Sequence, residues 1–509
     1  MYATVWSVGL TGINGHKVKI EADFTEGKSS FDIVGLPDAT VKESKERVRF
    51  AMINSGYFFP EGKITVNLAP AYLRKEGSAF DLAICLALIN ASGQGLKASE
   101  KTAVLGELSL NGELCKTKGV LPSVISAKEL GFDEIIVPAI NAFEASAVKE
   151  TNALGAETVK EVVSHVSGKK PLKKIVHQPF MPTFSENAGL DFADVKGQNM
   201  AKRAMEIAAV GGHNVLLIGP PGSGKSMLAK RLPTILPPIS YEESLETTKI
   251  YSVAGLLSPK MPIITERPFR SPHHTATTAG LTGGGSVPRP GEISLAHNGV
   301  LFLDELPEFQ KSSLESLRQP LEDRKITVSR AAVTVTYPSD ILIVAAMNPC
   351  RCGYFGHPTK KCVCSSSSVS NYLQKISGPL LDRLDLHVEV PAPEFEELSS
   401  LSRAESSAEI RKRVIEARER GKERLTAAGV FSNANLSGQI LHEAARLDKE
   451  TEDFLKTVFE KLALTARSYD KILKIALTVS DLNGHNGVLK SDIAEALQYR
   501  SLDRKYWNR

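Results

Sequence analysis

Apolar and polar positions in the first part of the chain follow the periods of both strands and helices. Residues 18–24 and 64–68 alternate apolar and polar side chains, as half-buried strands do. Residues 41–55, between them, carry apolar side chains at helical spacing, and residues 82–89 are an almost continuous apolar run that suits a buried helix. This pattern predicts a small α+β domain over residues 1–165.

The pattern ends in a basic, proline-containing segment. Lysines stand at positions 169, 170, 173 and 174, and Pro179 and Pro182 follow them. Prolines and like charges both favour an extended backbone. We therefore expect a linker over residues 166–190, and its basic run is typical of a solvated tether.

Short apolar strands alternate with helical stretches from residue 191 to residue 393. The strands are expected at residues 215–218, 300–303 and 341–346. This alternation is typical of a parallel, doubly wound α/β sheet. Residues 394–509 are instead highly charged and helical, with one apolar face formed by Tyr469, Ile472, Leu473, Ala476 and Val479. The fold class is therefore an α/β core that is followed by an all-helical domain.

The composition of the chain indicates where in the cell the protein is located, but it says little about the function. The 509 residues are 42% hydrophobic and 24% charged, which is ordinary for a globular protein. A net charge of +4 is too small to identify a partner. The chain has no run of about 18 uncharged apolar residues that could span a membrane. Its start lacks the features of a signal peptide. Four of its six cysteines are clustered, whereas a disulfide framework spreads its cysteines across the fold. We expect a cytoplasmic protein with no membrane partner.

The segment after the strand at 215–218 matches the phosphate-binding pattern G-x-x-x-x-G-K-[ST]. Its residues are Gly219, Pro220, Pro221, Gly222, Ser223, Gly224, Lys225 and Ser226. Backbone N–H groups that turn inward at a helix N-terminus bind phosphate. We expect Lys225 to contact the β- and γ-phosphates of ATP and the Ser226 hydroxyl to coordinate Mg²⁺. The strand before the loop and the helix after it provide the context that the motif requires.

Two further strand ends supply the rest of an ATP site. The strand at 300–303 ends in Asp304 and Glu305. We expect Asp304 to hold Mg²⁺ and Glu305 to polarise the attacking water as the general base. The strand at 341–346 leads to Asn348, whose amide can orient the same water from the far side of the γ-phosphate.

These motifs resemble the magnesium-chelatase-like branch of AAA+ ATPases, in particular the bacterial ComM/YifB family. The resemblance covers essentially the whole chain and includes residues 191–198, 291–306, 377–387 and 464–474. It implies that Arg383 is a finger that reaches the γ-phosphate of a neighbouring subunit and that Arg467 is a sensor on a helical lid. A finger that acts in trans requires a closed ring, and the family resembles hexameric motors.

The resemblance also implies a role on DNA, namely that of a translocase or branch-migration helicase in homologous recombination and in integration of transforming DNA. Residues 326–337 alternate around Arg330 and predict a β-hairpin. In the related MCM helicases the matching hairpin points a basic residue into the pore. With Arg324 and Lys325 nearby, the hairpin could present a basic ring to a phosphate backbone. The alternative is an exposed hairpin with ordinary solubilising charges.

Residues 34–138 resemble the proteolytic domain of Lon proteases, which use a serine that a lysine activates. Ser78 lies one place away from the nucleophile position, and Leu121 occupies the position of the lysine, with Lys118 close in sequence. The resemblance therefore implies a protease-like fold without the catalytic dyad.

The segment after Asn348 contains the four clustered cysteines, Cys350, Cys352, Cys362 and Cys364. Four thiols within fifteen residues can satisfy tetrahedral Zn²⁺. The C-x-C pairs are tighter than the usual C-x-x-C, and His357 is a possible substitute ligand. Structural zinc and merely reduced thiols remain two alternatives.

Three other functions compete with a DNA motor. A metal-chelatase ATPase subunit is disfavoured by the fused Lon-like domain, and an ATP-dependent protease is disfavoured by Leu121. The third is a protein-remodelling ATPase that does not act on DNA. Stimulation of ATP hydrolysis by DNA would separate the leading interpretation from all three.

Overall fold

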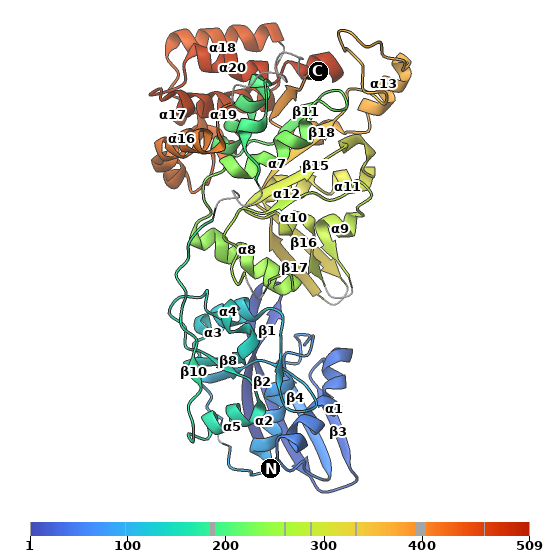
Figure 1. Cartoon of the computed structure of the whole chain (residues 1–509), viewed down its shortest axis with the longest axis vertical. Coiled ribbons are helices and arrows are strands. Elements are labelled where there is room, and N and C mark those ends of the chain that lie inside the picture. Colours follow the sequence, from blue (N-terminus) through green and yellow to red (C-terminus); the bar gives the residue numbers. More distant parts are fainter. Residues whose placement is uncertain are drawn as a thin grey trace.

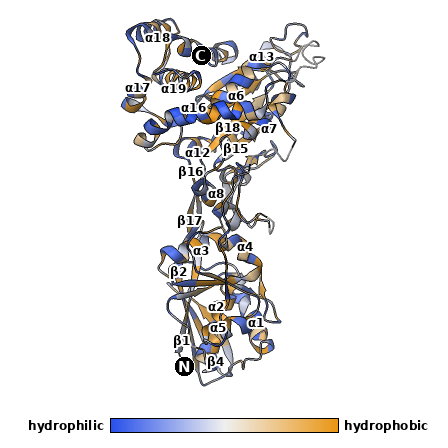
Figure 2. Ribbon diagram, turned by 60° about the vertical axis from the view of Figure 1, so that its left-hand side comes forward, coloured by the Kyte–Doolittle hydropathy of each residue, from blue (hydrophilic) through white to orange (hydrophobic). Residues whose placement is uncertain are grey.

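The computed structural model describes residues 2–96, 98–183, 189–258, 261–285, 288–330, 333–392, 404–462 and 464–507. The molecule is elongated, with the N-terminal domain at one end and the parallel sheet and the helical C-terminal region together toward the other end (Figure 1). Figure 2 shows hydrophobic residues along the central strands, whereas much of α16 is hydrophilic.

An eight-stranded sheet forms the N-terminal domain, in the order β10-β9-β8-β5-β1-β2-β4-β3. Its strands are β1 (Tyr2–Thr11), β2 (Asn14–Thr25), β3 (Ser30–Val34), β4 (Lys63–Ala69), β5 (Thr102–Val104), β8 (Glu134–Pro138), β9 (Ala153–Ala156) and β10 (Lys173–Lys174). A small ribbon pairs β6 (Glu107–Leu108) with β7 (Leu114–Cys115). The helices are α1 (Ala39–Asn54), α2 (Asp81–Ala91), α3 (Val120–Glu129), α4 (Ala142–Ala145) and α5 (Val159–Val166).

The hydrophobic pattern accounts for these elements. Val18, Ile20 and Ala22 of β2 are buried and alternate with more exposed neighbours, as the period of two requires. Helix α2 is buried along almost its entire length, and the Asp38 side chain caps the start of α1 by accepting a hydrogen bond from the Val41 N–H. The strand and helix predictions for this region are confirmed.

Part of the predicted linker belongs to the N-terminal sheet. Lys173 and Lys174 pair with β9 in antiparallel register, and the Ile175 N–H donates to the Ala153 carbonyl at 2.8 Å. An edge position explains how two lysines can be part of a strand, because their side chains remain in water. The described remainder of the predicted linker includes a backbone hydrogen bond from Thr183 to Thr265, and residues 184–188 lie outside the described part of the chain.

The central sheet is wholly parallel, in the order β12-β15-β18-β11-β19, as the alternating pattern predicts. Its strands are β12 (Phe269–Arg270), β15 (Gly299–Leu303), β18 (Ile341–Met347), β11 (Val215–Ile218) and β19 (Leu386–Glu389). The helices of this core are α6 (Asn199–Gly211), α7 (Lys225–Ile235), α8 (Tyr241–Ala254), α9 (Thr278–Thr282), α10 (Glu292–Leu295), α11 (Lys311–Glu315), α12 (Arg318–Asp323), α13 (Ser366–Leu373) and α14 (Gly378–Leu381). This is the fold of an AAA+ core.

Two antiparallel hairpins project from the core. One pairs β13 (Gly283–Gly284) with β14 (Arg289–Pro290), and the other pairs β16 (Lys325–Arg330) with β17 (Val333–Pro338). The second confirms the hairpin that the alternating residues predict, although its turn at Ala331 and Ala332 lies outside the described residues.

The C-terminal region is helical, and its helices are α16 (Ser407–Ala428), α17 (Gly438–Ala445), α18 (Lys449–Leu462), α19 (Ala466–Asn483), α20 (Lys490–Gln498) and α21 (Leu502–Trp507). Ile472, Leu473, Ala476 and Val479 of α19 are fully buried, which confirms the predicted apolar face. Helix α21 returns to the core and packs there through Leu502 and Tyr506. Within the described residues, no helix is both long enough and apolar enough to span a membrane.

The N-terminal domain docks against the core through α3 and the second hairpin. The Gly119 N–H donates to the Ser252 carbonyl of α8 at 3.2 Å, and Lys116 Nζ donates to the Leu257 carbonyl at 3.2 Å. A Cβ placed on Gly12, at the turn between β1 and β2, would lie 2.3 Å from a methyl carbon of Val335. The β1–β2 turn therefore sits directly on the hairpin.

Candidate ATP site and cysteine cluster

The phosphate loop connects β11 to α7 and turns in a way that requires glycine. Gly224 has a φ of 88°, in the left-handed region that favours glycine. A Cβ on Gly219 would lie 2.2 Å from the Val390 carbonyl oxygen, so a side chain does not fit there. Helix α7 begins at Lys225, which places the loop at a helix N-terminus where backbone N–H groups favour anions.

Lys225 lies between the phosphate loop and the end of β18. Its Nζ donates to the carbonyl oxygens of Gly219 at 2.8 Å and Pro220 at 2.9 Å, and to Oδ1 of Asn348 at 3.1 Å. Burial lowers the pKa of Lys225 below its ordinary value, and the nearby carboxylate of Asp304 offsets only part of this decrease. The structure thus brings Lys225 and Asn348 into direct contact across 123 positions of the sequence.

Ser226 and Asp304 form the second contact of the site. The Ser226 hydroxyl donates to Oδ2 of Asp304 at 2.7 Å, from the first turn of α7 to the end of β15. A hydroxyl and a carboxylate oxygen are hard ligands of the kind that Mg²⁺ accepts beside the phosphates of ATP. The residues present therefore fit ATP with Mg²⁺.

Glu305 has a partner that the sequence motifs do not indicate. Its backbone is left-handed, with a φ of 52°, and its side chain is 58% exposed. Nδ1 of His274 lies 3.1 Å from Oε2 of Glu305. The ring of His273 lies beside that of His274, with 4.1 Å between their centroids. Two adjacent histidines in a segment that lacks periodic apolar residues are the feature of the sequence that points to a functional role here. No local pattern, however, connects them with Glu305.

Gln198 is a second residue that the motifs miss. Its side-chain amide donates to the carbonyl of Ser223 within the phosphate loop. Its own φ of 52° is an uncommon conformation for a residue other than glycine. Gln198 therefore holds the loop from the start of α6.

Arg383 makes its contacts away from the phosphate loop, and Arg467 is exposed in the first turn of α19. Arg383 donates from NH1 to the Pro379 carbonyl at 2.7 Å and pairs through NH2 with Glu322. Burial lowers the pKa of Arg383, and the charges of Arg318 and Arg467 lower it further.

Asn214 ties the Arg383 segment to the central sheet. Its amide nitrogen donates to the Arg383 carbonyl at 3.0 Å, and its amide oxygen accepts from the Ile343 N–H of β18 at 2.8 Å. The strand that leads to Asn348 and the segment of Arg383 therefore share one side chain as a common support.

Asp385 ties the same segment to α19. It lies 3.3 Å from Lys471 Nζ and 3.5 Å from His213 Nδ1. Burial alone would raise the pKa of Asp385, but Lys471 and His213 hold it well below its ordinary value. Because α19 also carries Arg467, the carboxylate links the two segments that carry Arg383 and Arg467.

The three basic residues of the predicted DNA-binding hairpin do not gather at one place. Arg330 is exposed at the far end of β16, and its Nε donates to the Gly285 carbonyl at 3.4 Å. Arg324 stands at the base, half-buried, 3.7 Å from Asp340, and burial lowers its pKa. Six residues of strand separate the two by roughly 20 Å. Lys325 is exposed but also lies at the base, so the expected basic ring reduces to Arg330.

The N-terminal domain shows a different use of Ser78 from that of a protease serine. Its hydroxyl donates to a carboxylate oxygen of Glu107. Leu121 is fully buried, and Lys118 packs against Gly255 of the core. The Lon-like character and the absence of proteolysis stay predictions.

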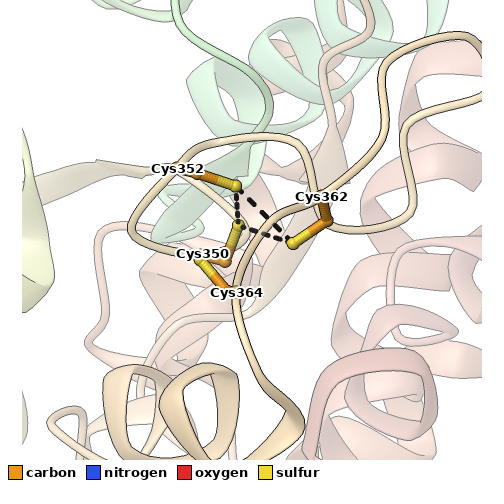
Figure 3. Close-up of side chains that lie close together, drawn as sticks. All are labelled: Cys350, Cys352, Cys362 and Cys364. Carbon is orange, nitrogen blue, oxygen red and sulfur yellow. Dashed lines mark hydrogen bonds between the residues drawn. The ribbon is translucent and has the colours of Figure 1, made fainter.

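The four cysteines meet in one cluster (Figure 3). Their sulfur atoms all lie within 4.8 Å of one another, and three pairs are closer, namely Cys350–Cys352 at 3.3 Å, Cys352–Cys362 at 3.5 Å and Cys350–Cys362 at 3.7 Å. His357 is not in this group, because its Nδ1 instead accepts from the N–H groups of Thr359 and Lys360. The arrangement can hold a metal ion through four sulfurs.

Three family models match the chain, and all belong to magnesium chelatases. The model for magnesium chelatase subunit ChlI matches residues 191–398, a second described as subunit ChlI of Mg-chelatase matches residues 20–141, and the model for the C-terminal part of subunit ChlI matches residues 404–500. Together they span the three regions of the structure.

Close relatives match over nearly their full length. Competence protein ComM of Haemophilus influenzae is 42% identical over 509 residues, covering 99% of this chain and 98% of the relative. Uncharacterized protein YifB of Salmonella typhimurium is 42% identical over 507 residues, covering 99% and 97%. The magnesium-chelatase 67 kDa subunit of Heliobacterium mobile is 25% identical over 237 residues, covering 41% of this chain and 35% of that subunit.

Proposed function

Because this chain belongs to the ComM/YifB family of magnesium-chelatase-like AAA+ proteins, we propose that it is a ring-forming ATPase that moves along DNA. The single observation that carries the ATPase is the meeting of Lys225, Asn348, Ser226 and Asp304 at the end of the parallel sheet. ATP and Mg²⁺ are the cofactors that this site suits. The cysteine cluster adds a candidate zinc site.

In the proposed hydrolysis, each side chain has one task. Lys225 neutralises phosphate charge, Ser226 and Asp304 hold the metal, and Asn348 orients the water. Glu305 accepts the proton of that water. Its exposure leaves room for the water beside the carboxylate.

A hexameric ring is the proposed assembly. Arg383 contacts groups other than the phosphate loop in its own chain, and Arg467 is exposed, which agrees with arginines that complete the site of a neighbouring subunit. In a closed ring every interface then contains one complete site. The shared supports Asn214 and Asp385 would transmit changes at one site to the next.

The proposed DNA contact is Arg330 at the far end of the hairpin. It is exposed and has no ion pair among the described residues. Copies of such a tip around a ring would converge on the axis and contact phosphates of the same strand. We propose branch migration or translocation in homologous recombination, acting in the cytoplasm. The name of the competence relative favours integration of transforming DNA among the candidate processes.

DNA-dependent ATP hydrolysis tests this function. We would measure the ratio of the rates with and without forked DNA at two salt concentrations, for the wild type, for Arg330→Ala and for Lys42→Ala as an exposed lysine of α1. Wild type and Lys42→Ala should show stimulation that weakens with salt, and Arg330→Ala should lose most of it. Absence of stimulation in the wild type would favour a protein-remodelling ATPase that does not act on DNA. Equal stimulation in wild type and Arg330→Ala would remove Arg330 from the mechanism.

A further inference from the structure

The spacing of the four cysteine sulfurs is that of ligands around a single metal ion. Ligands at the Zn–S distance of about 2.3 Å occupy the corners of a tetrahedron with edges of about 3.8 Å. The closest three pairs measure 3.3 to 3.7 Å, and all six pairs lie within 4.8 Å. A disulfide would need a separation of about 2.05 Å. The sulfurs are thus too far apart for disulfides and close to the tetrahedral spacing.

The surroundings of the cluster are those of a closed site. Cys350 is fully buried, and the other three cysteines are half-buried against apolar neighbours that include Tyr372 and Tyr506. Four sulfurs leave no coordination position for water, which is the arrangement of structural rather than catalytic zinc. Among divalent ions, an all-thiolate tetrahedral set selects a soft metal, with zinc as the redox-inert choice.

The segment that carries the cysteines touches the phosphate loop. Cys350 follows Asn348 by two residues, so its position fixes the end of β18. A Cβ on Gly353 would lie 2.4 Å from the Cδ of Pro221, which places Gly353 directly against the proline ring of the phosphate loop. Any displacement of this segment would therefore move both Asn348 and the phosphate loop.

The other side of the segment touches helix α21. The ring centroids of Phe355 and Tyr506 lie 6.3 Å apart, and a Cβ on Gly356 would lie 3.8 Å from the Cε of Lys505. Lys505 pairs with Glu389 of β19 at 2.7 Å. Residues 348–365 contain neither helix nor strand, and a long loop of this kind needs another source of rigidity. Metal binding can provide it.

We infer that Cys350, Cys352, Cys362 and Cys364 bind one Zn²⁺, and that this ion makes residues 350–364 a rigid strut between the phosphate loop and helix α21. The zinc site stands on the sulfur geometry alone. The consequence for hydrolysis rests on the proposed ATPase function.

Metal analysis tests the site without reference to activity. Protein purified without chelators should contain about one zinc per chain, and Cys362→Ser with Cys364→Ser should contain none. Cys115→Ser, which changes a cysteine in β7 of the N-terminal domain, is the matched control and should keep its zinc. Replacement by Co²⁺ should give the visible absorption of a tetrahedral all-thiolate site. Wild type without zinc that also fails to bind added Zn²⁺ or Co²⁺ would overturn the site.

Tryptophan fluorescence tests the strut in the wild-type fold, and so does not depend on whether the cysteine variants fold. The chain has two tryptophans, Trp6 and Trp507, so Trp6→Phe leaves Trp507 as the reporter on α21, next to the Tyr506 ring that faces Phe355 of the strut. Removal of the metal with a strong chelator should shift the Trp507 emission, and added Zn²⁺ should restore it. The same treatment should lower the hydrolysis rate by ~10- to 100-fold, the usual effect of losing groups that support a site. If zinc can be removed without changing the Trp507 emission or the hydrolysis rate, the strut is overturned and the metal site stands. If the emission changes but the protein never hydrolyses ATP, the proposed ATPase function is overturned instead.

Discussion

Nδ1 of His274 lies 3.1 Å from Oε2 of Glu305, and the two residues come from different strand ends of the central sheet. Glu305 is 58% exposed and its backbone is left-handed, so few other contacts hold its carboxylate. We infer that His274 positions the general base. A misplacement of about 1 Å at a reacting group can lower a rate by ~10²-fold.

His274→Ala should therefore lower kcat for ATP by ~10- to 100-fold while KM changes little. His274→Gln, which keeps a hydrogen-bonding side chain, should recover part of the rate. His273→Ala is the control, because His273 lies beside His274 but has its own partner in Thr275. Steady-state hydrolysis assays measure all three. A normal kcat in His274→Ala would show that the contact has no role in positioning.

Lys225→Ala and Glu305→Gln should separate binding from hydrolysis. Lys225→Ala removes the charge that contacts the phosphates, so both nucleotide affinity and turnover should fall. Glu305→Gln keeps the shape of the side chain but cannot accept a proton, so it should bind ATP and not hydrolyse it. Binding of a fluorescent ATP analogue and phosphate release measure the two effects. Rapid turnover by Glu305→Gln would contradict its role as the base.

Arg383→Ala should bind ATP nearly as well as the wild type and hydrolyse it ~10³-fold more slowly, as other arginine fingers do. The reason is that its contacts within its own chain are to Pro379 and Glu322 rather than to the phosphate loop. Mixing this variant with Lys225→Ala protomers should restore some hydrolysis, because a mixed ring contains interfaces with both groups intact. Arg413→Ala, which removes a different ion-paired arginine, is the control. Absence of rescue at full nucleotide occupancy would contradict action in trans.

The N-terminal domain should show no ATP-dependent cleavage of an unfolded protein substrate. The Ser78 hydroxyl donates a hydrogen bond to the Glu107 carboxylate, and the buried Leu121 occupies the position expected for the catalytic lysine. Lon-type catalysis depends on a lysine that activates the serine, and no lysine stands at that position here. Gel assays with casein over several hours measure the cleavage. Cleavage that Ser78→Ala abolishes would show that this domain is an active protease.

Several features of this protein could be predicted from the sequence because the signals are local. The phosphate loop lies in a strand-loop-helix segment of about twenty residues, and its glycines are required by backbone geometry within that segment. The strands that end at Asp304 and Asn348 are short apolar runs. The hairpin at residues 325–338 follows from alternation of side chains alone. Each of these depends on neighbours in the sequence.

Other features depend on contacts between distant residues, and only the tertiary structure decided them. Lys173 and Lys174 look like part of a solvated tether, yet the free edge of β9 pairs with them. Arg324 is close to Arg330 in sequence, but an extended strand rises by about 3.4 Å per residue. Arg324, directly before β16, and Arg330, at its end, are therefore far apart.

The same reason explains the functional contacts that were not foreseen. His274 reaches Glu305 because β12 and β15 are adjacent in the sheet, and Lys471 of α19 reaches Asp385 because α19 packs on the core. The sequence alone predicted which residues are candidates to bind a nucleotide and which are candidates to bind a metal. The tertiary structure decided which of them meet, because strand order and domain docking bring together side chains that no local pattern connects.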